Sequence, residues 1–500
     1  MAVLLFLIVP ALVFGFVAFL IGRSGILSRR QRIPHMVAEL KAMKSALERE
    51  YPPEPESAHD DTVIVRGSRL DAPESPSAPA GAQSPAVPED LEEGGIVLGG
   101  ILLPRSLESQ HFLFAGATGS GKTQGINLIL ETARTRRSRV IVADSGGGAL
   151  SRFFRAGDRI LNPLDARTAE WSPFAELRDK HDSERIARAV IPDAAGDSQE
   201  WNHYARTLMA ELLRAMWGLK QYETTSLLRL LTAAPPAELA MYLNGTPAQP
   251  FCQEGNEKML ANTRAIIGTY LSAWSNLTDN GSFSVRDWIR AEGGMSWLFI
   301  TYRDDQFALL RPLISTWLDL AIVEGLALDE DQPREIWFVM DEVDSLGKIS
   351  NLRQALTKLR KYGCKCVLGL QTVSQLRSTY GKDEAQTLMA NIGTKIVLRA
   401  GDGETAEYFS AEFGSQEIQR VQKSSSKASG VQFTKTQGSA EVRETRRTVL
   451  DSEIAGLDDL HGYLKAPGAL VPIELQYLQR DRVTSPYVPR GEGHSARAEA

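Results

Sequence analysis

The segment from His111 to Arg134 constrains the fold of this chain more than any other. It begins with the apolar run HFLFA (111–115), continues with GATGSGKT (116–123) and ends in a stretch of helical periodicity (124–134). A buried strand followed by a glycine-rich loop and a helix is the arrangement of a P-loop. The sequence therefore predicts an α/β fold with a phosphate site at the carboxyl end of this strand.

Each part of the loop 116–123 has a predicted role in holding a nucleotide. The three glycines let backbone N–H groups turn toward phosphate oxygens, and the start of the following helix adds a partial positive charge. Lys122 is expected to reach the β- and γ-phosphates of ATP, and the Thr123 hydroxyl to bind Mg²⁺. The predicted nucleotide-binding residues of the loop are Gly116, Ala117, Thr118, Gly119, Ser120, Gly121, Lys122 and Thr123.

A second predicted strand, Ile336–Met340, ends directly before Asp341 and Glu342. Adjacent carboxylates can also start a helix, but beside a P-loop they have the pattern of a Walker B motif. Asp341 is then predicted to bind the nucleotide's Mg²⁺ through the water shell of the metal, and Glu342 to orient and deprotonate the attacking water. A nucleotide switch can manage with the aspartate, whereas efficient hydrolysis benefits from the glutamate. The doublet therefore favours an ATP hydrolase.

Three further apolar runs, 139–143, 295–301 and 365–370, are predicted to complete a parallel sheet. Ligands bind beyond the carboxyl ends of such strands, so Asp144 and Gln371, which follow two of these runs, are candidate site residues. Gln371 is predicted to sense the γ-phosphate or to position water, and the alternative is a plain strand end. Asp144 stays open between a site residue and a helix cap.

The segment Arg353–Lys365 contains five basic residues and no acid, and its apolar spacing indicates a helix. A basic run of this kind is often a solvated surface. In a ring of subunits, however, one arginine could reach the ATP of a neighbour and neutralise transition-state charge. We predict Arg360 for this role. The predicted catalytic residues are therefore Lys122, Glu342, Gln371 and Arg360.

The N-terminus is a compositional anomaly, since Ala2–Gly22 is almost wholly apolar and carries no charge. As a helix it would measure about 32 Å, enough to cross a hydrocarbon core of about 30 Å. A cleaved signal peptide is the alternative, but it would have a basic start and a shorter apolar stretch. Arginines instead follow the stretch, within residues 23–32, which places the rest of the chain in the cytoplasm. We therefore predict an uncleaved single-pass anchor.

Composition divides the rest of the chain. Residues 35–51 have the spacing of an amphipathic helix, and the proline-rich, acidic stretch 52–93 is predicted to be a tether in which 62–66 could pair as a strand. Helical periodicity dominates 171–285, and the Ser- and Gly-rich stretch 415–450 is expected to be a pore-lining or flexible surface loop. The predicted domains are the anchor with its basic flank (1–33), the juxtamembrane helix and linker (34–93), the nucleotide-binding domain in two parts (94–170 and 286–480), an inserted all-α domain (171–285) and a disordered tail (481–500).

The net charge argues against a protein with a general basic surface, and the cysteine content argues against a protein held by disulfides. A net charge of −6 gives no general basic surface, so any contact with DNA must come from local clusters. The three cysteines, Cys252, Cys364 and Cys366, are too few for a disulfide framework. Cys364 and Cys366 are predicted to share one face of a strand, and we predict no structural zinc.

Taken together, several segments resemble the type IV secretion coupling proteins of the TraD and TrwB group. They are HFLFA with GATGSGKT, WFVMDEVDSLGKI, KLRKYGCKCVLGLQTVSQL, SFSVRDWI with LFITYRDD, and RPLIS, and the likeness spans residues 96–478. The resemblance implies a RecA-like P-loop NTPase domain with an all-α insertion, assembled as a homo-hexamer at the bacterial inner membrane. By motif match the family's ATPase roles fall on Lys122, Thr123, Asp341, Glu342, Arg360 and Gln371.

The resemblance also implies a function and partners. Such a protein would use ATP and Mg²⁺ to pump single-stranded plasmid DNA during conjugation, without base specificity, from a relaxase or relaxosome to the proteins of a type IV secretion channel. Family members commonly carry two membrane helices, whereas this sequence indicates one. Two alternatives stay open: an ATP-dependent docking receptor that does not translocate DNA, and a DNA pump of the chromosome-segregation type.

Overall fold

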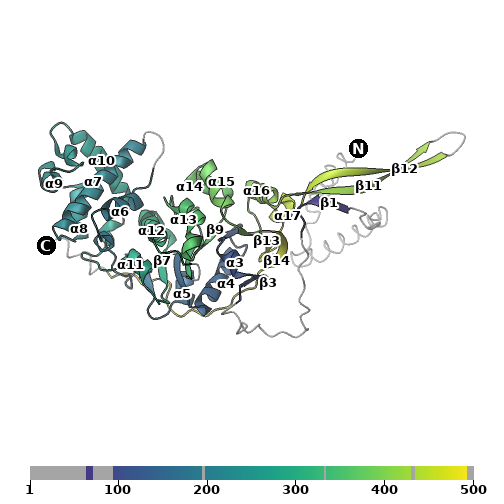
Figure 1. Ribbon diagram of the computed structural model, residues 1–500, viewed down its shortest axis with the longest axis horizontal. Helices are drawn as coiled ribbons and strands as arrows, with labels where there is room; N and C mark the ends of the chain where they lie inside the picture. The colour runs from purple at the N-terminus through teal and green to yellow at the C-terminus, as the bar shows by residue number, and fades with distance from the viewer. Residues whose placement is uncertain (1–62, 71–93, 194–197, 332–333, 429–433, 492–500) are drawn as a thin grey trace, which may run out of the picture. The chain divides into compact units, whose positions relative to one another are not determined.

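The computed structural model of the chain describes residues 63–70, 94–193, 198–331, 334–428 and 434–491 (Figure 1). The predicted membrane anchor, the amphipathic helix and most of the linker lie outside these residues. The chain divides into two compact units. One includes residues 418–443, and the other runs from 64 to 417 and continues from 444 to 500.

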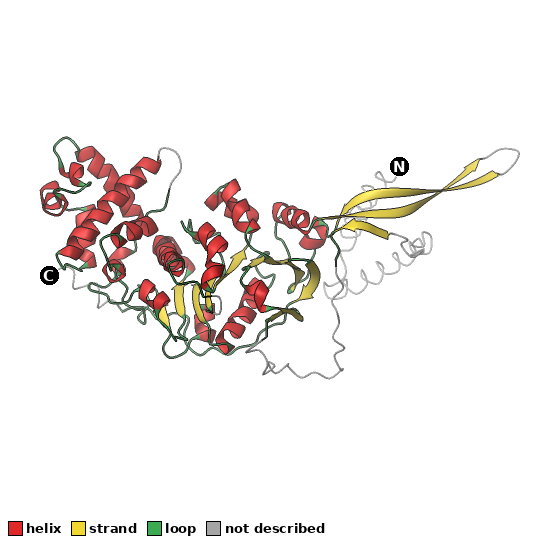
Figure 2. Cartoon of the chain, viewed as in Figure 1, coloured by secondary structure: helices red, strands yellow, loops and turns green. Residues whose placement is uncertain are grey.

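A nine-stranded sheet lies at the centre of the larger unit (Figure 2). The strand order is β14-β13-β10-β4-β9-β8-β5-β7-β6, with parallel pairing from β10 to β6 and antiparallel pairing of β13 and β14 at one edge. The strands are β4 (Phe112–Ala115), β5 (Arg139–Ser145), β6 (Arg159–Leu161), β7 (Leu298–Tyr302), β8 (Ile336–Met340), β9 (Cys364–Leu370), β10 (Thr394–Leu398), β13 (His461–Ala466) and β14 (Ala469–Glu474). The predicted α/β fold with a parallel sheet is confirmed, and the sequence did not predict β6, β10, β13 and β14.

Helices cover both faces of this sheet, so its parallel strands are buried. In β4, Phe112 and Phe114 belong to one hydrophobic cluster, which includes residues of α4 (Lys122–Thr135), while Leu113 and Ala115 belong to the cluster on the opposite face. Strands covered on both faces read as continuous apolar runs. This is why HFLFA and IWFVM were recognisable in the sequence.

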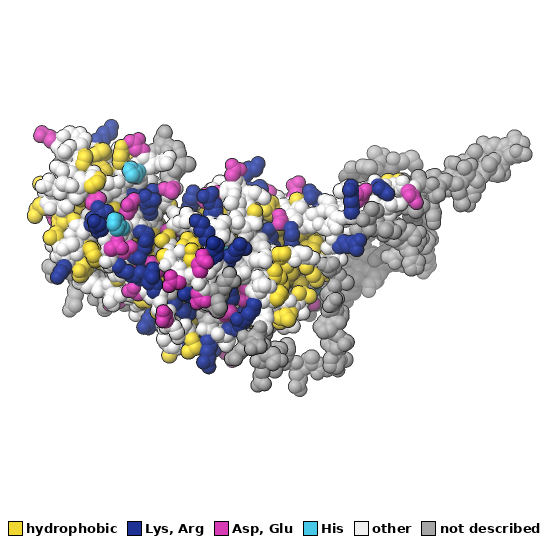
Figure 3. Space-filling model, in the orientation of Figure 1, with side chains coloured by type: hydrophobic (Ala, Val, Ile, Leu, Met, Phe, Trp, Pro, Cys, Tyr) yellow, Lys and Arg dark blue, Asp and Glu magenta, His cyan; other side chains and the backbone are white. Residues whose placement is uncertain are grey.

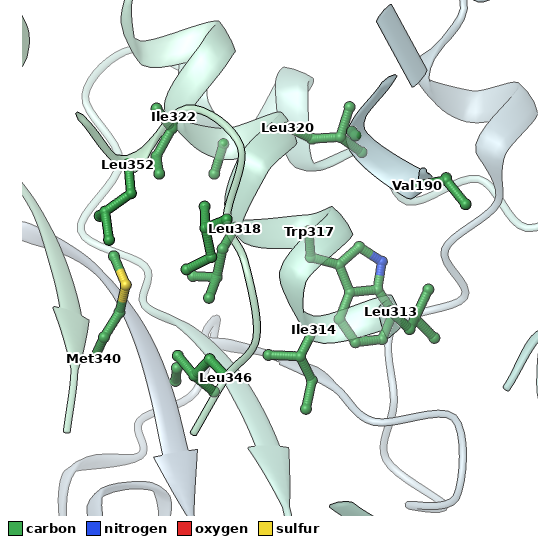
Figure 4. Packing of buried hydrophobic residues seen from close by; sticks show 14 of the residues in the cluster. Val190, Leu313, Ile314, Trp317, Leu318, Leu320, Ile322, Met340, Leu346 and Leu352 are labelled. Atoms are coloured by element: carbon green, nitrogen blue, oxygen red, sulfur yellow. The ribbon is translucent and has the colours of Figure 1, made fainter. Parts of the chain in front are cut away.

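The long helix α12 (Asp304–Gly325) fills the core on one face of the sheet. Leu313, Ile314 and Trp317 are buried there and belong to the same hydrophobic cluster as Met340 of β8 (Figure 4). Among the described residues this helix alone is long and apolar enough to cross a membrane by length and composition. Because these side chains pack against other parts of the same unit, we treat α12 as a core helix.

Helices occupy the stretch between β6 and β7, as the periodicity of 171–285 predicted. They are η2 (Pro173–Glu176), α6 (Asp182–Val190), α7 (Ser198–Gly218), α8 (Thr224–Thr232), α9 (Pro236–Leu243), η3 (Gln249–Cys252), α10 (Glu257–Tyr270), η4 (Trp274–Asn276) and α11 (Val285–Arg290). Their buried side chains, such as Leu208 and Leu231, belong to the same cluster as one face of the sheet. That this stretch is a separate inserted domain is a proposal.

The other elements of the larger unit connect or flank the sheet strands. Two short strands form a hairpin around Gly99 and Gly100, both with positive φ. The elements are β2 (Ile96–Leu98), β3 (Ile101–Leu103), α3 (Arg105–Glu108), α5 (Gly148–Phe153), α13 (Leu352–Lys358), η5 (Leu359–Tyr362), α14 (Val373–Tyr380), α15 (Lys382–Ala390), α16 (Gly403–Phe413) and α17 (Asp451–Ala455).

The expectation of a loop over 415–450 is wrong. Most of this stretch forms two long strands, β11 (Ser415–Ala428) and β12 (Thr434–Arg447), in a three-stranded sheet with the order β1-β11-β12. β1 (Val63–Gly67) matches the short strand expected in the linker. β11 and β12 are rich in polar residues, so they lack the apolar alternation that marks a strand half-buried against a core.

Two other expectations need correction. The basic helix predicted over 353–365 ends by Tyr362, and Lys365 lies buried in β9, where Glu108 and Glu335 pair with it. Residues 481–491, expected to start a disordered tail, instead follow the surface of the larger unit. There Tyr487 donates a hydrogen bond to Leu164 O at 2.9 Å.

Candidate functional site

The P-loop connects β4 to α4 at the carboxyl edge of the sheet. Gly116, Gly119 and Gly121 all have positive φ, as expected for a loop that turns its amides inward. A Cβ at Gly121 would lie 2.7 Å from Leu460 Cδ2, so this position also needs glycine for close packing. A hydrogen bond to the segment after β10 holds the loop in place, since Ala117 N donates to Arg399 O at 2.7 Å.

Lys122 lies inside the loop that it is predicted to serve. Its ammonium donates to Gly116 O at 2.7 Å and to Ala117 O at 3.0 Å. Burial lowers the pKa of Lys122, while the carboxylates of Asp341 and Glu342 act in the opposite direction. The side chain is held close to the position where a β- or γ-phosphate would take the place of these carbonyl acceptors.

The Walker B aspartate meets the P-loop directly. Thr123 Oγ1 donates a hydrogen bond to Asp341 Oδ2 at 2.9 Å. The other carboxylate oxygen, Oδ1, is buried and has no hydrogen-bond partner among the described residues. Burial also raises the pKa of Asp341. A hydroxyl beside a buried carboxylate with a free oxygen is a donor set that fits Mg²⁺.

The ends of β8 and β9 lie very close together behind this carboxylate. A Cβ at Gly369 would lie 1.8 Å from Asp341 O, and Val343 N donates to Gly369 O at 3.0 Å. Only glycine permits this approach. Gly369 therefore holds Asp341 and Gln371 at the ends of neighbouring strands.

Glu342 and Gln371 form a chain of hydrogen bonds to the P-loop. Gln371 Nε2 donates to Glu342 Oε1 at 2.6 Å, and Thr118 Oγ1 donates to Gln371 Oε1 at 3.3 Å. The amide thus joins the candidate base to the loop that would surround the phosphates. That Gln371 senses the γ-phosphate or positions water stays a prediction.

These side chains line one pocket of about 410 Å³. The pocket also includes Asp459, Leu460 and Tyr477, which sequence reasoning missed. Leu460 contacts the P-loop directly, since its N–H donates a hydrogen bond to Ser120 O at 2.9 Å. Tyr477 is 69% exposed. No local motif marks these residues, because they reach the site only through the antiparallel edge formed by β13 and β14.

The structure does not bring all the candidates together. Asp144 accepts hydrogen bonds from Ala149 N and Leu150 N, so it caps α5, and the cap alternative holds. Burial raises the pKa of Asp144 to about 6. Arg360 is exposed in η5, before β9, whereas Gln371 follows β9. At about 3.3 Å per residue, β9 separates Arg360 from the pocket of its own chain by about 20 Å or more.

Comparison with known proteins identifies the family of this site. The family model described as "Type IV secretion-system coupling protein DNA-binding domain" matches residues 95–476. The chain belongs to the type IV secretion-system coupling proteins. The resemblance seen in the sequence is therefore confirmed.

Relatives of known sequence support this membership. Coupling protein TraD of Escherichia coli (strain K12) is 31% identical over 413 residues, which cover 80% of this chain and 57% of TraD. Protein VirD4 of Rhizobium radiobacter is 24% identical over 382 residues, covering 69% of this chain and 54% of VirD4. The chain thus spans little more than half the length of these coupling proteins.

Solved structures of a relative match the fold as a whole. The bacterial conjugative coupling protein TrwBdeltaN70 is 32% identical, with a TM-score of 0.75 over 87% of this chain and 98% of that one. TrwB has also been solved in complex with ADP and Mg²⁺, and with the non-hydrolysable ATP analogue ADPNP, at TM-scores of 0.74 to this chain.

Proposed function

We propose that this coupling protein is a membrane-anchored, hexameric ATPase that couples a relaxosome to a type IV secretion channel and pumps single-stranded plasmid DNA during conjugation. ATP and Mg²⁺ are its proposed cofactors, and the bacterial inner membrane is its proposed location. The partners would be a relaxase and channel proteins.

The contact between Thr123 Oγ1 and Asp341 Oδ2, at 2.9 Å, carries this proposal. It brings the P-loop and the Walker B strand together around a buried carboxylate oxygen to which no described residue donates a hydrogen bond. One relative of the same fold, TrwB, has been solved with ADP and Mg²⁺ and with an ATP analogue. In this chain, the Thr123 hydroxyl and the Asp341 carboxylate support binding of ATP with its metal ion.

The residues of the chain divide the proposed reaction between them. The amides of the P-loop and the Lys122 ammonium would bind the phosphate oxygens, and Thr123 and Asp341 would hold Mg²⁺, which supplies positive charge to the phosphates when bound. Glu342 would accept a proton from the attacking water. Gln371 keeps the Glu342 carboxylate oriented through their 2.6 Å contact. The mechanism thus depends on positioning and electrostatics.

DNA contact would be local and insensitive to base sequence. In Figure 3, basic and acidic side chains alternate over the face drawn, in line with a chain of net charge −6. Binding to the phosphate backbone should therefore be weak at high salt.

ATP turnover of the full chain, in detergent and with or without single-stranded DNA, tests the proposal. We expect turnover that DNA stimulates. Turnover that DNA leaves unchanged would argue against a DNA motor, and no turnover under either condition would favour a docking receptor that binds ATP without translocation.

A further inference from the structure

A second cavity, lined by charged side chains, lies at the amino ends of the parallel strands, whereas the P-loop lies at their carboxyl ends. It has a volume of about 690 Å³ and opens at the amino ends of β5 and β8, beside residues that follow α11. Six arginines line it against four carboxylates. The arginines are Arg105, Arg136, Arg137, Arg139, Arg290 and Arg334. No residue of the nucleotide pocket belongs to this wall.

Most of these arginines are held by a carboxylate. Arg136 pairs with Glu108 at 2.8 Å, Arg334 lies 3.7 Å from Asp331, and Arg290 pairs with Glu324. Arg105 lies 3.5 Å from Glu335. These pairs neutralise part of the wall.

Arg139 has no such pair among the residues that the structure describes, although it is only 8% exposed. Its Nη1 donates to Ile289 O and Ala291 O, both at 2.9 Å, and its guanidinium lies 4.2 Å from the centre of the Trp288 ring. Nε and Nη2 are buried and have no hydrogen-bond partner among the described residues. Burial lowers the pKa of Arg139 to about 10, which still leaves it charged at neutral pH. A buried cation with free N–H groups lacks an acceptor.

Arg137 brings a second guanidinium to the same wall. It is exposed, and within the described part of the chain its side chain has no ion pair or hydrogen bond. Its φ of 57° lies in the left-handed region, directly after the C-cap of α4, where glycine is the usual residue. An arginine at this position accepts backbone strain to place its charge beside the cavity.

We propose that this cavity is an oxyanion site that binds a phosphate-bearing ligand, with the exposed Arg137 guanidinium as the direct donor and the buried charge of Arg139 behind it. Planar guanidinium groups bind phosphate oxygens through paired hydrogen bonds, and Arg137 and Arg139 give the wall two positive charges that form no ion pair with any described residue. Two sources carry this chemistry: the backbone of single-stranded DNA and a free nucleotide. Binding of this ligand does not depend on ATP hydrolysis, since the cavity lies at the amino ends of the parallel strands and the P-loop at their carboxyl ends.

Binding measurements on the full chain in detergent test the site with two probes. In the first arm, fluorescein-labelled oligo-dT is titrated between about 50 and about 200 mM salt. In the second arm, ADP is titrated by calorimetry in a Lys122→Ala background, where binding at the P-loop is weakened. The test variant is Arg137→Glu, because its exposed side chain has no partner to lose. Arg482→Glu, another exposed arginine that does not line the cavity, is the matched control.

If the ligand is the DNA backbone, Arg137→Glu weakens oligo-dT binding and lowers the slope of log K against log salt by about 1. If it is a nucleotide, Arg137→Glu removes the ADP heat that remains in the Lys122→Ala background. Arg139→Gln should act in the same direction, with thermal unfolding checked alongside. The proposal is overturned if Arg137→Glu matches Arg482→Glu in both arms.

Discussion

Glu342 is the residue on which the proposed hydrolysis depends. We expect Glu342→Gln to keep ATP binding, since the loop amides and Lys122 are untouched, and to lower turnover by about 10²- to 10⁴-fold, the usual contribution of a positioned base. Single-turnover hydrolysis and equilibrium binding of a fluorescent ATP analogue separate the two effects. A variant that turns over ATP like the unmodified chain would remove Glu342 as the base.

Tyr477 gives the pocket an exposed aromatic side chain beside the P-loop residues that are proposed to bind phosphates. We expect its ring to stack on the nucleobase, so that Tyr477→Ala weakens ATP binding by about tenfold, in line with about 1 to 3 kcal/mol for base–aromatic stacking. Tyr477→Phe keeps the ring and serves as the control. Equal losses in the two variants would show that the hydroxyl, and not the ring, matters.

His111 makes the stability of the core depend on pH. It is 1% exposed, its Nδ1 accepts a hydrogen bond from Cys366 N at 3.0 Å, and burial lowers its pKa from 6.5 to about 4. Because the folded state favours neutral histidine, its contribution is fully present above pH 6.5. It is lost as pH falls from about 6.5 to about 4, by up to about 3 kcal/mol.

Denaturant unfolding of the chain and of His111→Asn at several pH values measures this contribution. Asn can accept the same hydrogen bond and tolerates the positive φ of this position. Burial raises the pKa of Asp319 to about 6, which acts with the opposite sign, but Asp319 is present in both proteins and cancels in the difference. Parallel pH profiles for the two proteins would contradict the prediction.

At the scale of elements, the sequence predicted strands that are buried on both faces, because their burial appears in the sequence as a run of apolar residues. β8 and β9 are buried on both faces, so β8 is wholly apolar and β9 is apolar apart from Lys365, and a polar site residue follows each strand. β13 alternates between buried and half-buried positions, a signal that was present but not used. β11 and β12 give no such signal, because polar residues predominate in both, and the sequence does not show that they pair with each other.

The paired strands β11 and β12 are predicted to be dispensable for nucleotide binding. Residues 418–443 belong to the other compact unit, while every residue that lines the nucleotide pocket belongs to the larger unit. We expect that replacing 418–443 by a short Gly-Ser linker leaves ATP affinity unchanged, as measured by calorimetry. Loss of binding by a variant with an unchanged unfolding temperature would show that the pocket depends on the hairpin. A linker of scrambled 418–443 sequence is the control for length and composition.

At the scale of the whole molecule, the sequence could predict only part of the site. The P-loop, Asp341, Glu342 and Gln371 are predictable because each lies at the carboxyl end of a recognisable strand, and parallel strands bring those ends together. Leu460 and Tyr477 are not, since long-range pairing of β10 with β13 places their segment beside the P-loop. Arg360 lies at the amino end of β9, away from the nucleotide pocket of its own chain, so its predicted role requires a second subunit.

Mixing two inactive variants tests whether Arg360 acts on the nucleotide of a neighbour. Arg360→Ala keeps an intact pocket but lacks the finger, and we expect it to lose about 10³-fold in turnover. Lys122→Ala lacks a working pocket but keeps Arg360. If the arginine acts between subunits, co-assembled mixtures regain part of the turnover, at interfaces where an intact pocket meets an intact finger. Mixtures of Lys122→Ala with Glu342→Gln, both defective in the pocket, are the control and should stay inactive. Mixtures of the first two variants that stay equally inactive would rule out a finger supplied in trans.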